Sequence, residues 1–233
     1  LTPVNRMLHT KTAPITITIH FIVIGAVFVC NILLTGENIL QKGGSYKWAS
    51  MEEILGVPPE KATAADIERL GKAEVFQLFY AARTPSFASM KGEYRARTLA
   101  VGIMAAGADF FTHNFFGPGR WEGKAFFPFG NDKGWGYNLF RVVGVDGREA
   151  IVRTRKMDTF IGRSLIDDKS SFHLVYSPYN GGAVKSMRDE IRMINDRLYL
   201  GMGHMALGGG PVNPAPFILI GPAERWIGLD NDK

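Results

Sequence analysis

The chain has 233 residues, of which 46% are hydrophobic and 21% charged, and its formal net charge is +5 at pH 7. Its single cysteine excludes an internal disulfide framework and a cysteine-based zinc cage. Lysine and arginine are scattered among aspartate and glutamate, without a basic run interleaved with aromatic residues. Nucleic acid is therefore not an expected partner. The mild excess of positive charge also suits a surface near anionic lipid.

The first predicted element is an apolar segment near the N-terminus. Residues 12–36 carry no Asp, Glu, Lys or Arg, and most of residues 13–34 are Ile, Val, Leu, Phe or Ala. A helix over residues 13–34 is roughly 33 Å long at 1.5 Å per residue, and the hydrocarbon core of a bilayer is about 30 Å thick. We therefore predict a single-pass membrane protein, with residues 1–36 as the N-terminal flank and transmembrane helix.

Three other interpretations of this segment stay open. Residues 15–19 alternate strictly, as in a half-buried strand, but the apolar run continues past the usual length of a strand. A cleaved signal peptide has a shorter apolar region followed by an A-x-A-like site, which residues 31–35 do not offer. A buried helix of a soluble domain is the third interpretation. The basic residues that flank the segment are balanced, so the positive-inside rule assigns no orientation.

A polar linker over residues 37–49 leads to a helical lead-in over residues 50–83. Its boundaries are marked by two capping boxes, a proline pair and one glycine: Ser50 with Glu53, Thr63 with Asp66, Pro58-Pro59, and Gly71. Apolar residues at helical spacing follow each start, which predicts amphipathic helices that close one end of a core. The lead-in belongs to a domain over residues 50–233.

Short extended runs separated by turn signals dominate the rest of the chain. Eight strands are predicted, over residues 93–101, 120–127, 137–143, 149–155, 170–176, 189–194, 198–206 and 216–220. Because helices do not alternate with these runs, the pattern favours a mainly β fold, an antiparallel barrel or sandwich, over a βαβ fold. Residues 103–116 are the exception and form either a helix or an aromatic loop.

Several motifs follow one another across the predicted barrel. They are Gly92-Glu-Tyr94-Arg, then Trp121-Glu-Gly-Lys-Ala-Phe126 (W-x-G-K-x-F), Tyr176-Ser-Pro-Tyr-Asn, Met187-Arg-Asp-Glu-Ile-Arg192 and Leu198-Tyr-Leu-Gly-Met202. In this order they resemble the GXWXG-type lipocalin-like (calycin) barrel family of unknown function, over residues 90–222. The first motif has Tyr94 where the family has Trp, and Ala96 where it has Gly. The resemblance implies a lipocalin-like barrel and no particular catalytic residue.

A small antiparallel barrel can enclose one apolar ligand between its inward-facing side chains. The candidate ligand contacts are Tyr94, Trp121, Phe126, His173 and Tyr176. Chlorophyll, a carotenoid or a lipid is the expected ligand class, in the barrel or at the transmembrane helix. The alternative is that these aromatic side chains only fill the core, which is their ordinary role.

The sequence offers little catalytic chemistry. No histidine stands at metal-ligand spacing, and neither a nucleophile elbow nor a Walker loop is present, so no metal site is predicted. Asp109 and His113 would lie one turn apart if residues 103–116 are helical, which makes them the best available acid–base pair. Whether the protein is an enzyme is left open, with a non-catalytic role preferred.

A charged cluster follows residue 187. On a strand, Arg188, Glu190 and Arg192 share one face, which predicts an ion-pair ladder on the surface. The alternative is that the cluster, including Asp189, forms the polar floor of a pocket.

His20 and Asn31 are polar residues of the predicted transmembrane helix. They lie eleven residues apart, about three helical turns, so both point to nearly the same side. Ionisable residues inside a bilayer are costly and tend to mark a function or a partner. This stripe predicts contact with another membrane helix or with a tetrapyrrole pigment, unless His20 lies close enough to the head groups to be hydrated.

Three functions fit these observations. The first is a non-catalytic accessory or linker subunit of an organellar membrane complex, with a photosystem–antenna assembly of the thylakoid favoured over a respiratory assembly of the mitochondrial inner membrane. The second is a membrane-anchored carrier of lipid or pigment. The third is an isomerase or cyclase that acts on such a ligand. The chain begins with Leu1 instead of Met, and we expect that an organellar targeting peptide precedes it.

Overall fold

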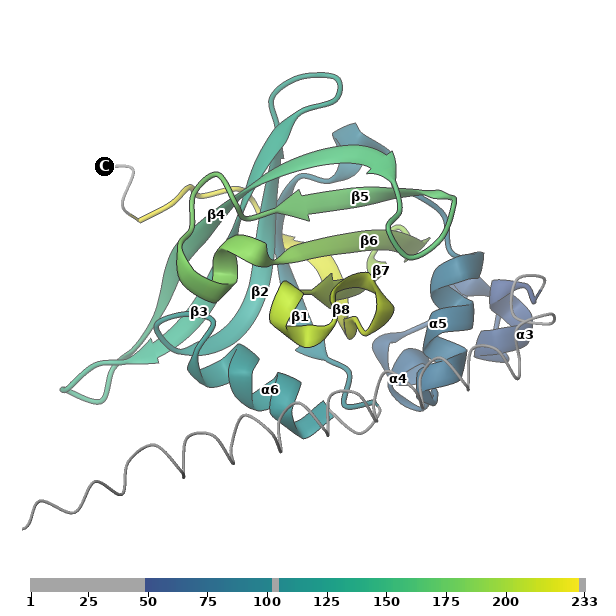
Figure 1. Ribbon diagram of the computed structural model, residues 1–233, viewed down its shortest axis with the longest axis horizontal. Helices are drawn as coiled ribbons and strands as arrows, with labels where there is room; N and C mark the ends of the chain where they lie inside the picture. Colours follow the sequence, from purple (N-terminus) through teal and green to yellow (C-terminus); the bar gives the residue numbers. More distant parts are fainter. Residues whose placement is uncertain (1–48, 102–104, 231–233) are drawn as a thin grey trace, which may run out of the picture.

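A computed structural model describes residues 49–101 and 105–230 (Figure 1). Its centre is a closed antiparallel barrel in which each strand pairs with the next along the chain, and the first pairs with the last. The eight strands are β1 (Gly92–Thr98), β2 (Arg120–Pro128), β3 (Gly134–Val143), β4 (Glu149–Arg163), β5 (Ser170–Val175), β6 (Arg188–Asn195), β7 (Leu198–His204) and β8 (Ala215–Glu224). The predicted mainly β class and the antiparallel barrel are confirmed.

The helices of the lead-in are short and begin where their capping residues predict. They are α3 (Met51–Leu55), α4 (Ala64–Glu68) and α5 (Lys72–Ala81). The Ser50 N–H donates to Glu53 over 2.7 Å, and the Thr63 N–H donates to Asp66 over 2.9 Å, so both predicted capping boxes form. A further helix, α6 (Ala105–Asn114), occupies the segment that the sequence left as helix or loop.

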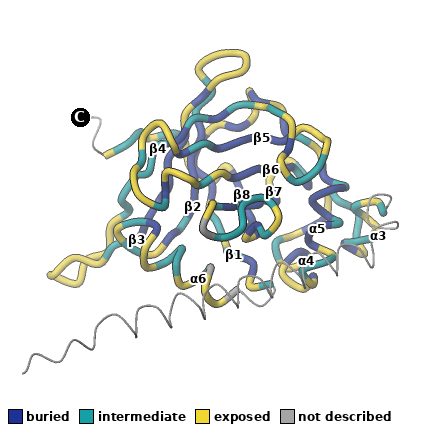
Figure 2. Tube along the Cα trace, viewed as in Figure 1, coloured by how far each residue is buried: buried dark blue, intermediate teal, exposed yellow. Residues whose placement is uncertain are grey.

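The two largest clusters of buried side chains lie on opposite faces of the barrel wall, because successive side chains of a strand point to opposite sides. Figure 2 shows buried residues along β5, β6 and α5. The interior is filled mainly by aromatic side chains, among them Tyr94, Phe126, Phe140, Phe172 and Tyr199. The outer core joins α3–α5 to the outward side chains of β6, β7 and β8: Ile67, Val75, Leu78, Phe79, Ile194, Leu200, Met202 and Ile218. Each fully buried aliphatic or aromatic side chain stabilises the fold by about 1.5–3 kcal/mol.

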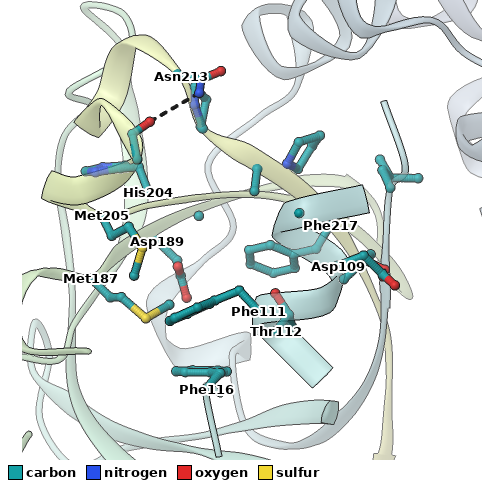
Figure 3. A pocket seen from close by; sticks show the side chains of 18 of the residues that line it. Asp109, Phe111, Thr112, Phe116, Met187, Asp189, His204, Met205, Asn213 and Phe217 are labelled. Atoms are coloured by element: carbon teal, nitrogen blue, oxygen red, sulfur yellow. Dashed lines mark hydrogen bonds between the residues drawn. The ribbon is translucent and has the colours of Figure 1, made fainter. Parts of the chain in front are cut away.

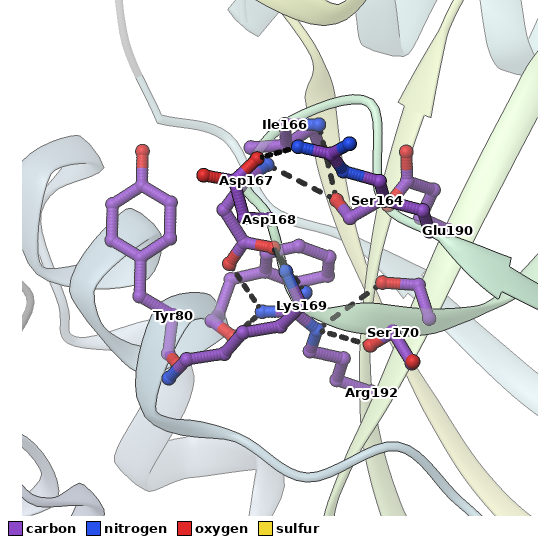
Figure 4. A network of polar contacts seen from close by, with 12 residues as sticks. Tyr80, Ser164, Ile166, Asp167, Asp168, Lys169, Ser170, Glu190 and Arg192 are labelled. Atoms are coloured by element: carbon purple, nitrogen blue, oxygen red, sulfur yellow. Dashed lines mark hydrogen bonds and ion pairs between the residues drawn. The ribbon is translucent and has the colours of Figure 1, made fainter.

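The predicted surface ion-pair ladder on β6 is wrong. Glu190 and Arg192 are fully buried on the outer face of the barrel, because α5 and the loop after β4 cover them (Figure 4). Arg192 donates to both oxygens of Asp167 over 2.6 and 2.5 Å and to the Phe79 carbonyl over 2.8 Å. Period-two alternation identified the shared face correctly, but it carries no information about what covers that face.

Among the residues that the structure describes, none of the helices combines the length and the apolar character needed to cross a membrane. The predicted transmembrane helix over residues 13–34, with His20 and Asn31, lies outside the described residues.

Candidate functional site

A cavity of about 350 Å³ lies at one end of the barrel (Figure 3). Its wall comes from the last residues of β1 and β7, the first residues of β2 and β8, the residues just before β6, and α6. The lining is largely apolar and includes Phe111, Phe116, Trp121, Met187, Met205 and Phe217. A volume of this size and a lining of this composition are typical of sites for small organic ligands.

The floor of the cavity is a buried ion pair between Lys124 of β2 and Asp189 of β6. The Lys124 Nζ lies 2.7 Å from Asp189 Oδ2, and both side chains are 2% exposed. Lys124 also donates to the Tyr176 hydroxyl over 2.6 Å and to Asn138 Oδ1 over 3.0 Å. The Tyr176 hydroxyl in turn donates to Asp189 over 2.9 Å. Every proton of the ammonium group therefore has an acceptor, which is the condition under which a buried charge is tolerated.

Aromatic rings surround the ammonium group of Lys124. Their centroids lie between 5.1 and 5.7 Å from Nζ and belong to Phe116, Trp121, Tyr176 and Phe217. Such rings attract a cation through their negative faces. Burial lowers the pKa of Lys124, although the neighbouring Asp189 carboxylate by itself raises this pKa. Burial and Asp189 together hold the pKa of the Tyr176 hydroxyl well above its ordinary value. The hydroxyl therefore stays protonated and acts as a hydrogen-bond donor.

Helix α6 is tied to the barrel by the predicted acid–base pair. The Trp121 N–H donates to His113 Nδ1 over 3.2 Å, so the neutral ring carries its proton on Nε2, which lies 3.4 Å from Asp109 Oδ1. Asp109 also accepts from the Thr98 hydroxyl over 2.5 Å. The structure brings Asp109 and His113 together as predicted, and Asp109 lines the cavity. His113 Nδ1 thus holds α6 to β2, while Nε2 contacts Asp109 of the same helix, which in turn holds α6 to β1.

Polar side chains also lie at the mouth of the cavity. Lys72 donates to Asn213 Oδ1 over 3.2 Å, and burial lowers the pKa of Lys72. His204, at the end of β7, is 7% exposed and lines the cavity. Burial lowers the pKa of His204, while the carboxylates of Asp189 and Glu190 act in the opposite direction. The mouth thus carries hydrogen-bonding groups around an apolar interior.

The predicted ligand contacts lie in three different places. Trp121 lines the cavity, and Tyr176 contacts the floor residues Lys124 and Asp189. Tyr94 and Phe126 pack on each other deeper in the barrel, with ring centroids 5.4 Å apart. His173 lies on the outer face, stacked on Phe160 with ring centroids 5.0 Å apart. Of these five residues, the structure brings Trp121 and Tyr176 together at the cavity.

Sequence reasoning missed Lys124 and Asn138 as site residues. Lys124 belongs to the W-x-G-K-x-F motif, yet nothing in that motif says that the lysine points inward. The register of β2 against β3 shifts between Trp121 and Gly123, so a simple count of alternate residues along β2 misplaces its side chains. Asp189 was found by the pocket-floor alternative for the charged cluster, which is confirmed for this one residue.

Comparisons with known proteins give a similarity to a solved structure. No family model and no curated protein matches the chain. The crystal structure of a protein from Thermomonospora curvata is 20% identical, with a TM-score of 0.46, over 67% of this chain and 90% of that chain. At this identity and TM-score the similarity carries no argument about activity or ligands, so the function must follow from the residues of the site itself.

Proposed function

We propose that the barrel binds a small, largely apolar molecule with a single oxygen function, as a carrier does. The observation that supports this is the arrangement of one cavity, in which aromatic and aliphatic side chains form the walls and the polar groups of the floor converge on Lys124. The apolar body of the ligand would lie among Phe111, Phe116 and Phe217, and its oxygen would take the place of one of the acceptors to which Lys124 now donates, such as Asn138 Oδ1.

The charges on the floor favour a neutral ligand over an anionic one. Asp189 already neutralises Lys124 at 2.7 Å, so a ligand carboxylate would bring an uncompensated negative charge into a buried site. A carbonyl or hydroxyl oxygen needs only a donor. The proposed ligand class is therefore an apolar aldehyde, ketone or alcohol, and a free fatty acid is expected to bind more weakly.

Filling part of the cavity is expected to weaken this binding. Ala183, in the 3-10 segment Gly182–Ser186, lines the cavity, and Ala183→Phe places a ring inside it. We expect Ala183→Phe to weaken binding of the neutral dye Nile red by about tenfold or more, as measured by fluorescence titration, because the added ring occupies space that a ligand of this size needs. The matched control, Ala150→Phe at the exposed start of β4, should bind like the unmodified protein. Equal binding by both variants, or no binding by the unmodified protein, contradicts the proposal.

Membership of the GXWXG-type lipocalin-like barrels is part of the same proposal. Its support is that residues from three of the separate motifs meet in one cluster. Lys124 comes from the W-x-G-K-x-F motif, Tyr176 begins the Tyr-Ser-Pro-Tyr-Asn motif, and Asp189 lies in the Met-Arg-Asp-Glu-Ile-Arg motif. A shared site explains why motifs so far apart in the chain occur together.

The accessory-subunit hypothesis stays a separate prediction, with its membrane partners, its pigment contacts at His20 and Asn31, and its thylakoid location. It depends on the uncharged residues 12–36. We expect the protein to migrate within a large complex on a native gel after gentle detergent extraction. Migration of the 25.7 kDa chain alone would refute the accessory-subunit hypothesis.

An isomerase or cyclase activity remains a separate prediction. It rests on Asp109, which lines the cavity.

A further inference from the structure

The cavity places two amines in very different surroundings. Among the residues that the structure describes, the lysines that line the cavity are Lys72 and Lys124. Lys72 is at the mouth and is hydrogen-bonded to Asn213. Lys124 is at the floor, with its side chain 2% exposed beside a carboxylate and a phenol. Amines withdrawn from water next to a proton acceptor are the ones that react with carbonyl carbons in proteins.

We propose that Lys124 binds its ligand covalently and reversibly, as an imine with an apolar aldehyde held in the cavity. This inference rests on the proposed function, since the aldehyde must first occupy the cavity. Asp189 accepts and returns protons, and Tyr176 hydrogen-bonds the aldehyde oxygen during the addition.

The reaction balances without any further reactant. The Lys124 ammonium transfers one proton to Asp189, and the neutral amine adds to the aldehyde carbon, so that a C–N bond forms as the C=O π bond opens. A second proton passes from nitrogen to oxygen through the Tyr176 hydroxyl, which gives a carbinolamine. Asp189 returns its proton to the hydroxyl group, the C–O bond breaks and water leaves. The products are a protonated imine and one molecule of water.

The floor suits this product because the charges are the same before and after the reaction. The starting state holds the Lys124 ammonium against the Asp189 carboxylate at 2.7 Å. The product holds a protonated imine against the same carboxylate, so no new charge is buried. The rings of Phe116, Trp121 and Phe217 that face the ammonium group can face the iminium group in the same way.

A purely stabilising ion pair is the alternative for Lys124, and the two roles predict different chemistry. A structural lysine whose protons are all hydrogen-bonded should react with aldehydes more slowly than a solvated lysine does. A lysine that forms an imine with a bound ligand should react faster than a solvated one, because the cavity holds the aldehyde next to it.

Reductive trapping on the unmodified full-length protein distinguishes these roles. The protein is incubated with decanal and sodium cyanoborohydride, which converts the imine into a stable secondary amine, and the site is located by peptide mass mapping. We expect the initial rate of alkylation at Lys124 to exceed the rates at exposed Lys133 and Lys185 by about tenfold or more. Adding 1-decanol, which fills the cavity but cannot form an imine, should suppress labelling at Lys124 and leave the exposed lysines unchanged.

The outcomes distinguish a failure of the imine proposal from a failure of the proposed binding function. If decanol displaces Nile red but Lys124 is labelled no faster than Lys133, the imine is refuted and the carrier function stands. If neither decanal nor decanol displaces Nile red, the proposed function fails as well. Labelling of Lys72 in place of Lys124 also overturns the assignment, and Lys133→Gln, at an exposed position outside the cavity, should leave trapping at Lys124 intact. Lys124→Arg, which keeps the charge beside Asp189, should lose trapping while retaining the fold by circular dichroism.

Discussion

Replacing Asp189 by alanine is expected to lower the free energy of unfolding by about 3–5 kcal/mol, because the change leaves a buried ammonium group without its counter-charge. Lys124 stays 2% exposed among four aromatic rings, so water compensates its charge poorly. Tyr176 also loses the carboxylate to which it donates over 2.9 Å. Urea unfolding followed by circular dichroism measures the effect.

Two comparisons test the cause of this loss. Lys124→Met combined with Asp189→Leu removes both charges and should recover most of the stability, since well-packed apolar pairs can replace a buried ion pair. Glu149→Ala breaks an exposed contact with Arg141 of similar length, 2.7 Å, and should cost at most about 1 kcal/mol. If Asp189→Ala costs no more than Glu149→Ala, the floor is hydrated and Lys124 and Asp189 do not form a buried ion pair.

Arg192→Ala should be similarly destabilising, by about 3–5 kcal/mol, on the opposite face of the barrel wall. The fully buried guanidinium joins three pieces of the chain: the β6 strand that carries it, the Asp167 loop and the Phe79 carbonyl at the end of α5. Its loss leaves a carboxylate and a carbonyl without their donor. We expect faster amide hydrogen exchange throughout α5 together with the lower urea midpoint.

The neighbouring aspartate of the same loop supplies the matched control. Arg163 pairs with Asp168, but these side chains are 77% and 85% exposed. Arg163→Ala should therefore change the free energy of unfolding by less than about 1 kcal/mol. Equal effects of the Arg163 and Arg192 substitutions would mean that the lead-in helices are held by apolar packing alone.

The strand content of the fold was predictable because its signals are local. Turn residues such as Asp146-Gly147 interrupt the apolar runs at short intervals, and all eight predicted runs overlap a strand of the barrel. The capping boxes at Ser50 and Thr63 were predictable for the same reason, since a cap involves residues three positions apart. Closure into a barrel was not fixed locally, because a sandwich uses the same strands.

The site was only partly predictable, since its residues meet through long-range pairing. Trp121 and Tyr176 were chosen as aromatic residues of a possible cavity, without any indication that they share Asn138 as a hydrogen-bond partner. The depth of Lys124 depends on the register shift in β2. The burial of Arg192 depends on α5, which lies more than a hundred residues earlier in the chain. Neither the depth of Lys124 nor the burial of Arg192 can be read from the local sequence pattern of β2 or β6.

The pairing of β1 with β8 has a consequence for when the cavity comes into existence. Thr98 and Phe217 face each other across this last seam of the barrel, and both line the cavity. Joining residues so distant along the chain is a slow step of folding, so the cavity is completed only when the barrel is. A ligand that spans the seam binds the closed barrel alone and stabilises closure by mass action. For the proposed carrier, ligand binding and folding are one coupled equilibrium, and an empty barrel is expected to open more often along β1 and β8 than a filled one.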